Sequence, residues 1–206
     1  MSRMNVALIG FAAVFCVAIG CSAATPSSPT VAEEAVAGGR LVMAFTPESG
    51  SFNAATDAYR QLWREEGAPI AETLERVTGL PFTQRRITAI VYEGRSSAGI
   101  GNNPMRLRAS YNADTKRSAL AHELGHRLIA QLTIRPPDLD EHRVLDLFLY
   151  DVWQIIWGTA FADRQVQVES AQRGFYDYES AWRWAISLSR ADRAARFAAI
   201  VQANRR

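Results

Sequence analysis

Cysteine is nearly absent from this chain of 206 residues. The two cysteines, Cys16 and Cys21, both lie near the N-terminus. The sequence from residue 22 onward therefore has no thiol that could form a disulfide, bind a metal ion or act as a nucleophile. Histidine is scarce as well, with three residues. Any metal ion bound by this part of the chain must be held by histidine and carboxylate side chains.

The sequence also lacks a concentration of positive charge. Its formal net charge is +2, and no basic run exceeds two residues. Nucleic-acid binding needs a dense cationic face, so we expect no nucleic-acid partner. Hydrophobic residues make up 48% of the chain, which is enough for a core without disulfides. The length fits one domain plus a processing segment, and we expect a monomer.

The one long uncharged hydrophobic run covers residues 6–19 and follows a short N-terminal region that contains Arg3. It is too short for a membrane-spanning helix and has the layout of a secretory signal. The next residues complete the sequence Ala18-Ile19-Gly20-Cys21, which resembles a bacterial lipobox with Ala18 in place of the usual leucine. In that motif the cysteine becomes the acylated first residue, so Cys21 is the expected lipidation site.

These features predict an exported protein of the cell envelope, anchored by lipid to a bacterial membrane. We assign residues 1–20 to a signal peptide, 21–38 to a lipid-anchored tether rich in proline and serine, and 39–206 to one domain. The alternative is ordinary cleavage after Ala23 or Ala24, which would give a secreted or periplasmic soluble protein.

The pattern along the domain predicts three strands followed by helices. Strands are expected at residues 39–46, 86–92 and 105–111. Helices are expected at 53–66, from Pro69 to 79, from Asp114 to about 132, and from Asp138 to about 157, with helical sequence continuing to the end. Residues 93–104 form a loop rich in glycine, serine and asparagine, either a surface connection or a lid. The predicted fold is α+β, a small three-stranded sheet followed by a helical half.

A sequence with a direct chemical meaning lies in the helix predicted from Asp114: His122-Glu123-Leu124-Gly125-His126. Two histidines four residues apart project from one helix face, and both can bind one ion at about 2.0–2.1 Å. Glu123 lies at the edge of that face, where it can accept a proton from a metal-bound water without binding the metal. The motif therefore predicts a Zn²⁺ site with Glu123 as general base.

This motif resembles that of the zincin metallopeptidases. The resemblance implies a small sheet before the motif helix, a following helix that supplies a third ligand, and a sheet edge that binds an extended peptide. Residues 105–111 or 86–92 would supply that edge. Together with the secretory signal, it predicts an exported zinc-dependent peptidase acting on peptides or proteins. The alternative is a catalytically inactive, zincin-like envelope binding protein whose zinc is structural.

The chain departs from both main branches of that group. The metzincin branch has glycine and histidine where this chain has Ile129 and Leu132, so it is excluded. The gluzincin branch uses a glutamate about twenty residues after the motif, but the sequence there is Leu145-Asp146. The resemblance is therefore gluzincin-like, with an atypical third ligand.

The third ligand is expected on the apolar helix that begins near Asp138. His142 is our first choice because it is the remaining histidine, with Asp146 and Glu141 as alternatives. Asp146, one turn after His142, can instead hydrogen-bond to it and orient it. For Glu141 we favour a capping box with Asp138. Asp151 faces the opposite side, where it can accept hydrogen bonds from a neighbouring element, such as an arginine.

Three further residues, Tyr176, Tyr178 and Glu169, bear on the chemistry of the site. With all three histidines on the metal, stabilisation of a tetrahedral oxyanion would fall to a tyrosine or an arginine. Tyr176 and Tyr178 are the candidates, although aromatic packing ahead of the next helix is the simpler interpretation of both. We expect Glu169 to be a solvated charge.

Overall fold

The computed structural model describes residues 33–35, 41–174 and 176–205. The predicted signal peptide, Cys21 and most of the predicted tether lie outside the described residues. Every described residue belongs to one compact unit, Val31–Arg206. Within the described part, no helix is both long and apolar enough to cross a membrane.

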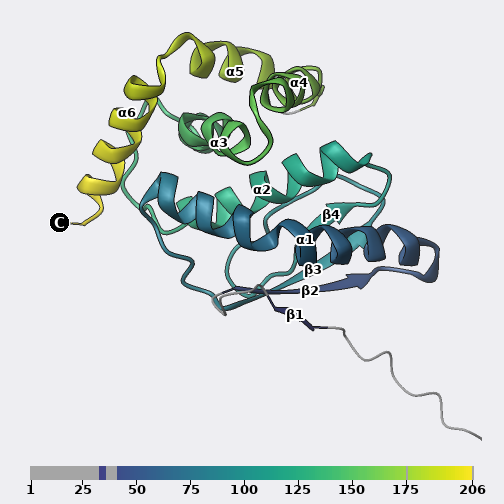
Figure 1. Cartoon of the computed structure of the whole chain (residues 1–206). Coiled ribbons are helices and arrows are strands. Elements are labelled where there is room, and N and C mark those ends of the chain that lie inside the picture. Colours follow the sequence, from purple (N-terminus) through teal and green to yellow (C-terminus); the bar gives the residue numbers. More distant parts are fainter. Residues whose placement is uncertain (1–32, 36–40, 175, 206) are drawn as a thin grey trace, which may run out of the picture. The chain divides into compact units, whose positions relative to one another are not determined.

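The sheet has the three predicted strands, all parallel, in the order β2 (Val42–Pro47), β3 (Arg86–Tyr92) and β4 (Met105–Arg108). A short strand, β1 (Glu33–Ala35), pairs antiparallel with β2. It lies inside the segment predicted to be a tether. β3 has the predicted bounds. The structure therefore confirms the α+β class, with a small sheet ahead of a helical half (Figure 1).

β4 ends three residues earlier than predicted. After Arg108, the ammonium group of Lys116 donates hydrogen bonds to two backbone carbonyls, those of Ala109 (2.7 Å) and Tyr111. These carbonyls turn toward the start of the next helix, so they cannot continue a strand ladder.

The prediction of two helices separated at Pro69 is wrong, because one helix, α1 (Asn53–Thr78), runs through the proline. Proline removes one intrahelical hydrogen bond and costs about 3 kcal/mol inside a helix. Burial on both sides of it offsets this cost, since Tyr59 and Trp63 before the proline and Ile70 and Leu74 after it are fully or almost fully buried. The helix ends where Gly79 adopts a left-handed conformation (φ 66°).

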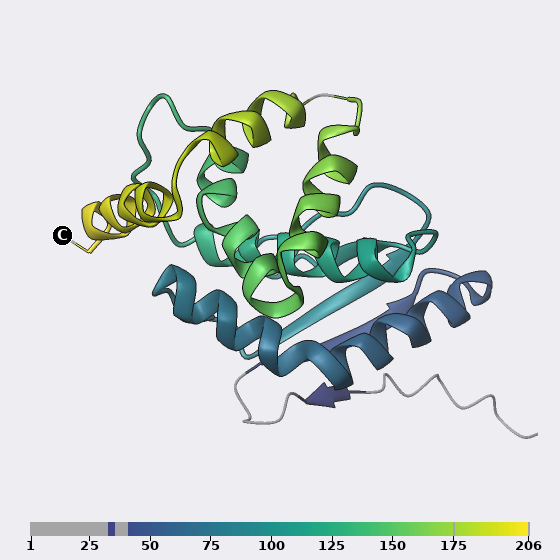
Figure 2. The ribbon, with the colours of Figure 1, turned by 45° about the horizontal axis from the view of Figure 1, so that its top comes forward.

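The helical half follows the sheet. Its elements are α2 (Ala113–Ile129), α3 (Glu141–Trp157), α4 (Thr159–Ser170), α5 (Tyr178–Ser187) and α6 (Arg190–Ala203). The short 3-10 helix η1 (Gly50–Phe52) comes earlier, between β2 and α1. α1 and α2 lie on one face of the sheet, α3 packs against both, and α4, α5 and α6 pack around α3 (Figures 1 and 2). α2 begins one residue before the predicted Asp114, because Asn112 is the N-cap and accepts from the Thr115 amide (2.8 Å).

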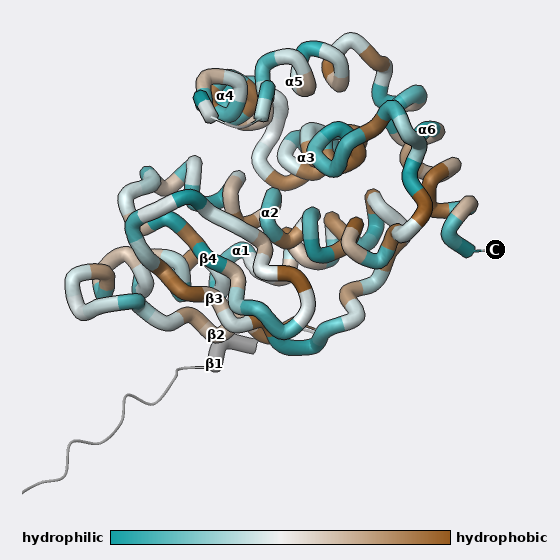
Figure 3. The backbone as a smooth tube through the Cα atoms, turned by 180° about the vertical axis from the view of Figure 1, so that it is seen from behind, coloured by the Kyte–Doolittle hydropathy of each residue, from teal (hydrophilic) through white to brown (hydrophobic). Residues whose placement is uncertain are grey.

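The core lies between the sheet and α3. Alternate strand residues such as Ile87, Ala89 and Val91 are buried, and hydrophobic stretches follow the strands in Figure 3. α3 is buried on most sides, as its composition predicts. The prediction for Asp151 is confirmed, because its carboxylate accepts from Arg193 of α6 at 2.7 and 3.0 Å. This buried ion pair fixes the last helix to the centre of the helical half.

Candidate metal centre

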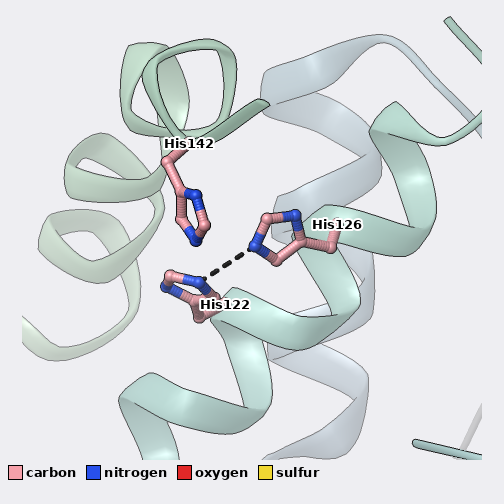
Figure 4. A group of neighbouring side chains, drawn as sticks. All are labelled: His122, His126 and His142. Carbon is pink, nitrogen blue, oxygen red and sulfur yellow. Dashed lines mark hydrogen bonds between the residues drawn. The ribbon is translucent and has the colours of Figure 1, made fainter. Parts of the chain in front are cut away.

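Three histidines from two helices converge on one point (Figure 4). His122 and His126 lie on successive turns of α2, and His142 is the second residue of α3. The Nε2 atoms of His122 and His126 are 3.1 Å apart, and one ligand atom from each of the three residues lies within 4.8 Å of the others. Two nitrogens at 2.0–2.1 Å from a tetrahedral ion are about 3.3 Å apart. The cluster can therefore hold a metal ion.

The close approach of α2 and α3 depends on a glycine within the motif. A Cβ atom added at Gly125 would lie 2.5 Å from Cδ1 of Leu145 on α3. A side chain at position 125 would thus push α3 away. The start of α3 is fixed by Asp140, whose carboxylate accepts from the Arg143 amide (2.9 Å). Together these contacts place His142 opposite the two motif histidines.

Each motif histidine has a carboxylate on the ring nitrogen that faces away from the cluster. Nδ1 of His122 lies 3.0 Å from Glu169 of α4, and Nδ1 of His126 lies 2.8 Å from Glu141 of α3. The other oxygen of Glu169 accepts from the indole N–H of Trp182 (3.0 Å). Such carboxylates orient the rings and make Nε2 the nitrogen available to a metal ion.

These contacts overturn two predictions. Asp140, not Asp138, caps α3, so Glu141 has no capping-box role there and instead holds His126. Glu169 is 5% exposed and not a solvated charge. The spacing of Phe161, Gln165 and Glu169, four residues apart on the buried face of α4, is a signal that would have placed Glu169 inside.

Asp146 lies outside the cluster. It is 1% exposed, and its Oδ2 has no hydrogen-bond partner in the part of the chain that the structure describes. Burial raises its pKa well above the ordinary value, and the nearby Glu169 adds to this effect. The three histidines together form the candidate site without Asp146.

The surroundings give the three histidines different charges. Burial disfavours the protonated form of His122, but the neighbouring Glu169 outweighs it and raises the pKa of His122 to about 9. Burial lowers the pKa of His126, and that of His142 to about 3. Without metal, the raised pKa of His122 favours a proton between the two Nε2 atoms, which are 3.1 Å apart. This proton occupies the place where a metal ion would bind.

Glu123 lies beside the cluster in a cleft of about 480 Å³. Its side chain is mostly buried, and no described residue forms a hydrogen bond with its carboxylate. Burial raises the pKa of Glu123 to about 7, opposed mainly by the positive charge of His122. The carboxylate is thus free to exchange a proton with a molecule bound in the cleft near neutral pH.

The two predicted tyrosines also line this cleft. The Tyr178 hydroxyl donates to Nε2 of His142 (3.1 Å) and accepts from Nη2 of Arg95 (2.9 Å). The Tyr176 ring stacks on His142 with centroids 4.2 Å apart, and its hydroxyl donates to Asp140 (2.8 Å). Tyr178 therefore presents its hydroxyl at the cluster, whereas Tyr176 supports the His142 ring.

One wall of the cleft is the loop between β3 and β4, from Arg95 to Ile100. Sequence reasoning identified this loop but missed Arg95. β3 lies between β2 and β4, so the expectation that residues 86–92 form a free peptide-binding edge is wrong. β4 is at the edge of the sheet, and at Arg106 it pairs with Ser97 of the loop through two hydrogen bonds (2.8 and 2.9 Å).

Comparison of the chain with known protein families, with curated proteins and with solved structures finds no match. Its function has to be inferred from the chemistry of the site.

Proposed function

We propose that this chain is an exported zinc-dependent peptidase. The observation that carries the proposal is the position of Glu123, in the same cleft as three converging histidines and with no hydrogen-bond partner among the described residues. Three histidine ligands leave a fourth coordination position for water or substrate, as in catalytic zinc sites. Imidazole ligands suit zinc. Export is supported by the signal-like residues 6–19 and the lipobox ending at Cys21.

Zinc held by these histidines would lower the pKa of a bound water and polarise the substrate carbonyl. Glu123 accepts the proton that this water loses as its oxygen bonds to the carbonyl carbon. The same carboxyl group then gives the proton to the nitrogen of the breaking C–N bond. Burial raises the pKa of Glu123 and so helps its carboxylate to take up this proton.

Tyr178 is the candidate for stabilising the oxyanion. Its hydroxyl donates to Nε2 of His142, and a nitrogen that binds metal no longer has a lone pair to accept this bond. The hydroxyl is then free to donate to a developing negative charge beside the cluster. Tyr176 is a weaker candidate, because its hydroxyl already donates to Asp140.

An extended peptide fits beside the loop wall of the cleft. Ser97 uses its N–H and C=O to pair with Arg106, so in an extended segment the backbone groups of its neighbour Ser96 point the other way. A substrate strand can pair with these groups, since this segment lines the same cleft as the histidines.

The test is the variant Glu123→Gln, loaded with zinc and assayed on a mixture of peptides. We expect one zinc ion per chain, as in the unmodified protein, and hydrolysis at least about a hundredfold slower, because the base is lost and the ligands remain. Glu179→Gln, which removes an exposed carboxylate on α5, is the matched control. Full activity of Glu123→Gln would refute the mechanism. Stoichiometric zinc without any hydrolysis by the unmodified protein would favour the inactive binding protein.

A further inference from the structure

Among the described residues that line the cleft, Arg95 is the one arginine, and none is a lysine. Its Nη2 donates to the Tyr178 hydroxyl (2.9 Å), which lies 3.1 Å from Nε2 of His142. The guanidinium group is thus two hydrogen-bond lengths from a ligand atom of the metal cluster. It brings a permanent positive charge close to the reacting groups.

The guanidinium group of Arg95 has N–H groups that form no hydrogen bond with a described residue. Nearby arginines on β4 are paired, Arg106 with Glu48 (2.5 Å) and Arg108 with Glu93 (2.6 Å). Arg95 forms no ion pair with any carboxylate in the described ranges, and its hydrogen bond to Tyr178 uses one of five N–H groups. A planar guanidinium with free donors is suited to bind a carboxylate through two parallel hydrogen bonds.

The loop that carries Arg95 is held in place by hydrogen bonds from Arg127 of α2 and Tyr92 of β3. Arg127, the residue after the second motif histidine, is 9% exposed and donates to the backbone carbonyls of Ala98 (2.8 Å), Asn103 (2.7 Å) and Gly99. The Tyr92 hydroxyl donates to the carbonyl of Arg95 itself. The charge is therefore positioned before any ligand arrives, which reduces the entropic cost of binding.

We propose that Arg95 binds a carboxylate of the substrate, so that the cleft selects peptides with a carboxylate within about two residues of the scissile bond. The inference rests on the proposed peptidase function. An extended chain spans about 3.3–3.6 Å per residue, so two hydrogen-bond lengths correspond to less than two residues. The carboxylate is either the free C-terminus or an aspartate or glutamate side chain.

The other charges of the cleft restrict where this carboxylate can lie. Glu123 and Glu141 line the same cleft and repel an anion placed beside them. Arg95 offers the opposite charge at the loop wall. A substrate carboxylate is therefore accepted at Arg95 and rejected next to Glu141.

Binding of three N-acetylated peptides to the zinc-loaded Glu123→Gln protein tests the inference by calorimetry. One peptide has a free C-terminus, one is neutral and amidated, and one is amidated with a glutamate at the last position. We expect at least one anionic peptide to bind roughly tenfold to a hundredfold more tightly than the neutral one. Which anionic peptide is preferred identifies the source of the carboxylate.

The preference should disappear when Arg95→Gln is added and persist in part with Arg95→Lys. Arg183→Gln, which removes an exposed positive charge on α5, should leave it unchanged. Equal binding of all three peptides to the parent, or an undiminished preference with Arg95→Gln, would overturn the proposal.

Hydrolysis of the same peptides by the unmodified zinc-loaded protein separates the two proposals. Cleavage of all three peptides at equal rates, with no selective effect of Arg95→Gln, would support the peptidase function and refute the carboxylate site. Selective binding that depends on Arg95, without cleavage of any peptide, would support the carboxylate site and refute the peptidase function.

Discussion

At the scale of single residues, His122 and Glu169 determine how the site responds to pH. The carboxylate raises the pKa of His122 to about 9, so at pH 7.5 the metal-free site holds one extra proton. A metal ion must displace it, because both compete for the same Nε2. His126 and His142, with lowered pKa values, compete only in more acidic solution.

We therefore expect zinc binding at pH 7.5 to release about one proton from this site, and the affinity to fall about tenfold per pH unit as the pH drops below 9. Calorimetry in buffers of different ionisation enthalpy measures the proton release. Glu169→Gln should bring the pKa of His122 back toward its ordinary value and reduce the release. Glu141→Gln, which contacts His126 instead, should retain it. An affinity independent of pH between 7 and 8.5 would contradict this explanation.

The site residues differ in how far the sequence could predict them. His122, Glu123 and His126 follow from local helix spacing, and His142 follows from the scarcity of histidine. Arg95 belongs to a loop without periodicity, and its place depends on Tyr178, 83 residues away. Glu169 meets His122 across 47 residues, and only the packing of α4 against α2 brings them together.

At the scale of elements, the contact between α2 and α3 sets the position of His142. Gly125→Ala places a Cβ atom 2.5 Å from Cδ1 of Leu145, which is a fully buried side chain. We expect a loss of about 1–3 kcal/mol of unfolding free energy from overpacking, reduced by up to about 1 kcal/mol because alanine favours helix. Zinc affinity should fall as well, because α3 carries a ligand.

Chemical denaturation and zinc titration measure both effects. The double variant Gly125→Ala/Leu145→Ala removes the clashing atom, so the cost of the alanine at position 125 should be smaller in that background than in the unmodified protein. Strict additivity of the two substitutions would exclude the clash as the cause.

The elements themselves were predictable where local pattern decides them. The β-branched and aromatic residues of β3 gave its bounds without error, and the composition of α3 indicated a buried helix. The sequence gives no local sign that α1 continues through Pro69, because tertiary burial offsets the missing hydrogen bond. β4 is short for a similar reason, because a tertiary contact ends it. Lys116, eight residues after Arg108, donates hydrogen bonds to the carbonyls of Ala109 and Tyr111.

At the scale of the whole molecule, a bound metal ion would link the sheet-covering helix α2 to the central helix α3. Ligands that bind only the folded state stabilise it, by about 2.7 kcal/mol at a hundred times the Kd. For a chain of this size, 1 kcal/mol corresponds to about 2–4 °C in Tm. We expect zinc at this excess to raise the Tm by roughly 5–10 °C.

Thermal unfolding with zinc and with a chelator measures this shift, which should be largely lost in His142→Ala. Arg143→Ala, a substitution at the neighbouring position outside the cluster, should retain it. An equal shift in His142→Ala would mean that His142 is not a ligand.

The distribution of the site over α2, α3 and α4 has a consequence for biosynthesis. A chain made from its N-terminus completes His122 and His126 before His142 and Glu169 have been added. Two histidines on an isolated helix form a weak and unselective site, and the carboxylates that orient them arrive only with the later helices. A metal ion would therefore be loaded late, after the helical half has folded. If the chain is exported unfolded, it acquires its metal in the compartment where it works.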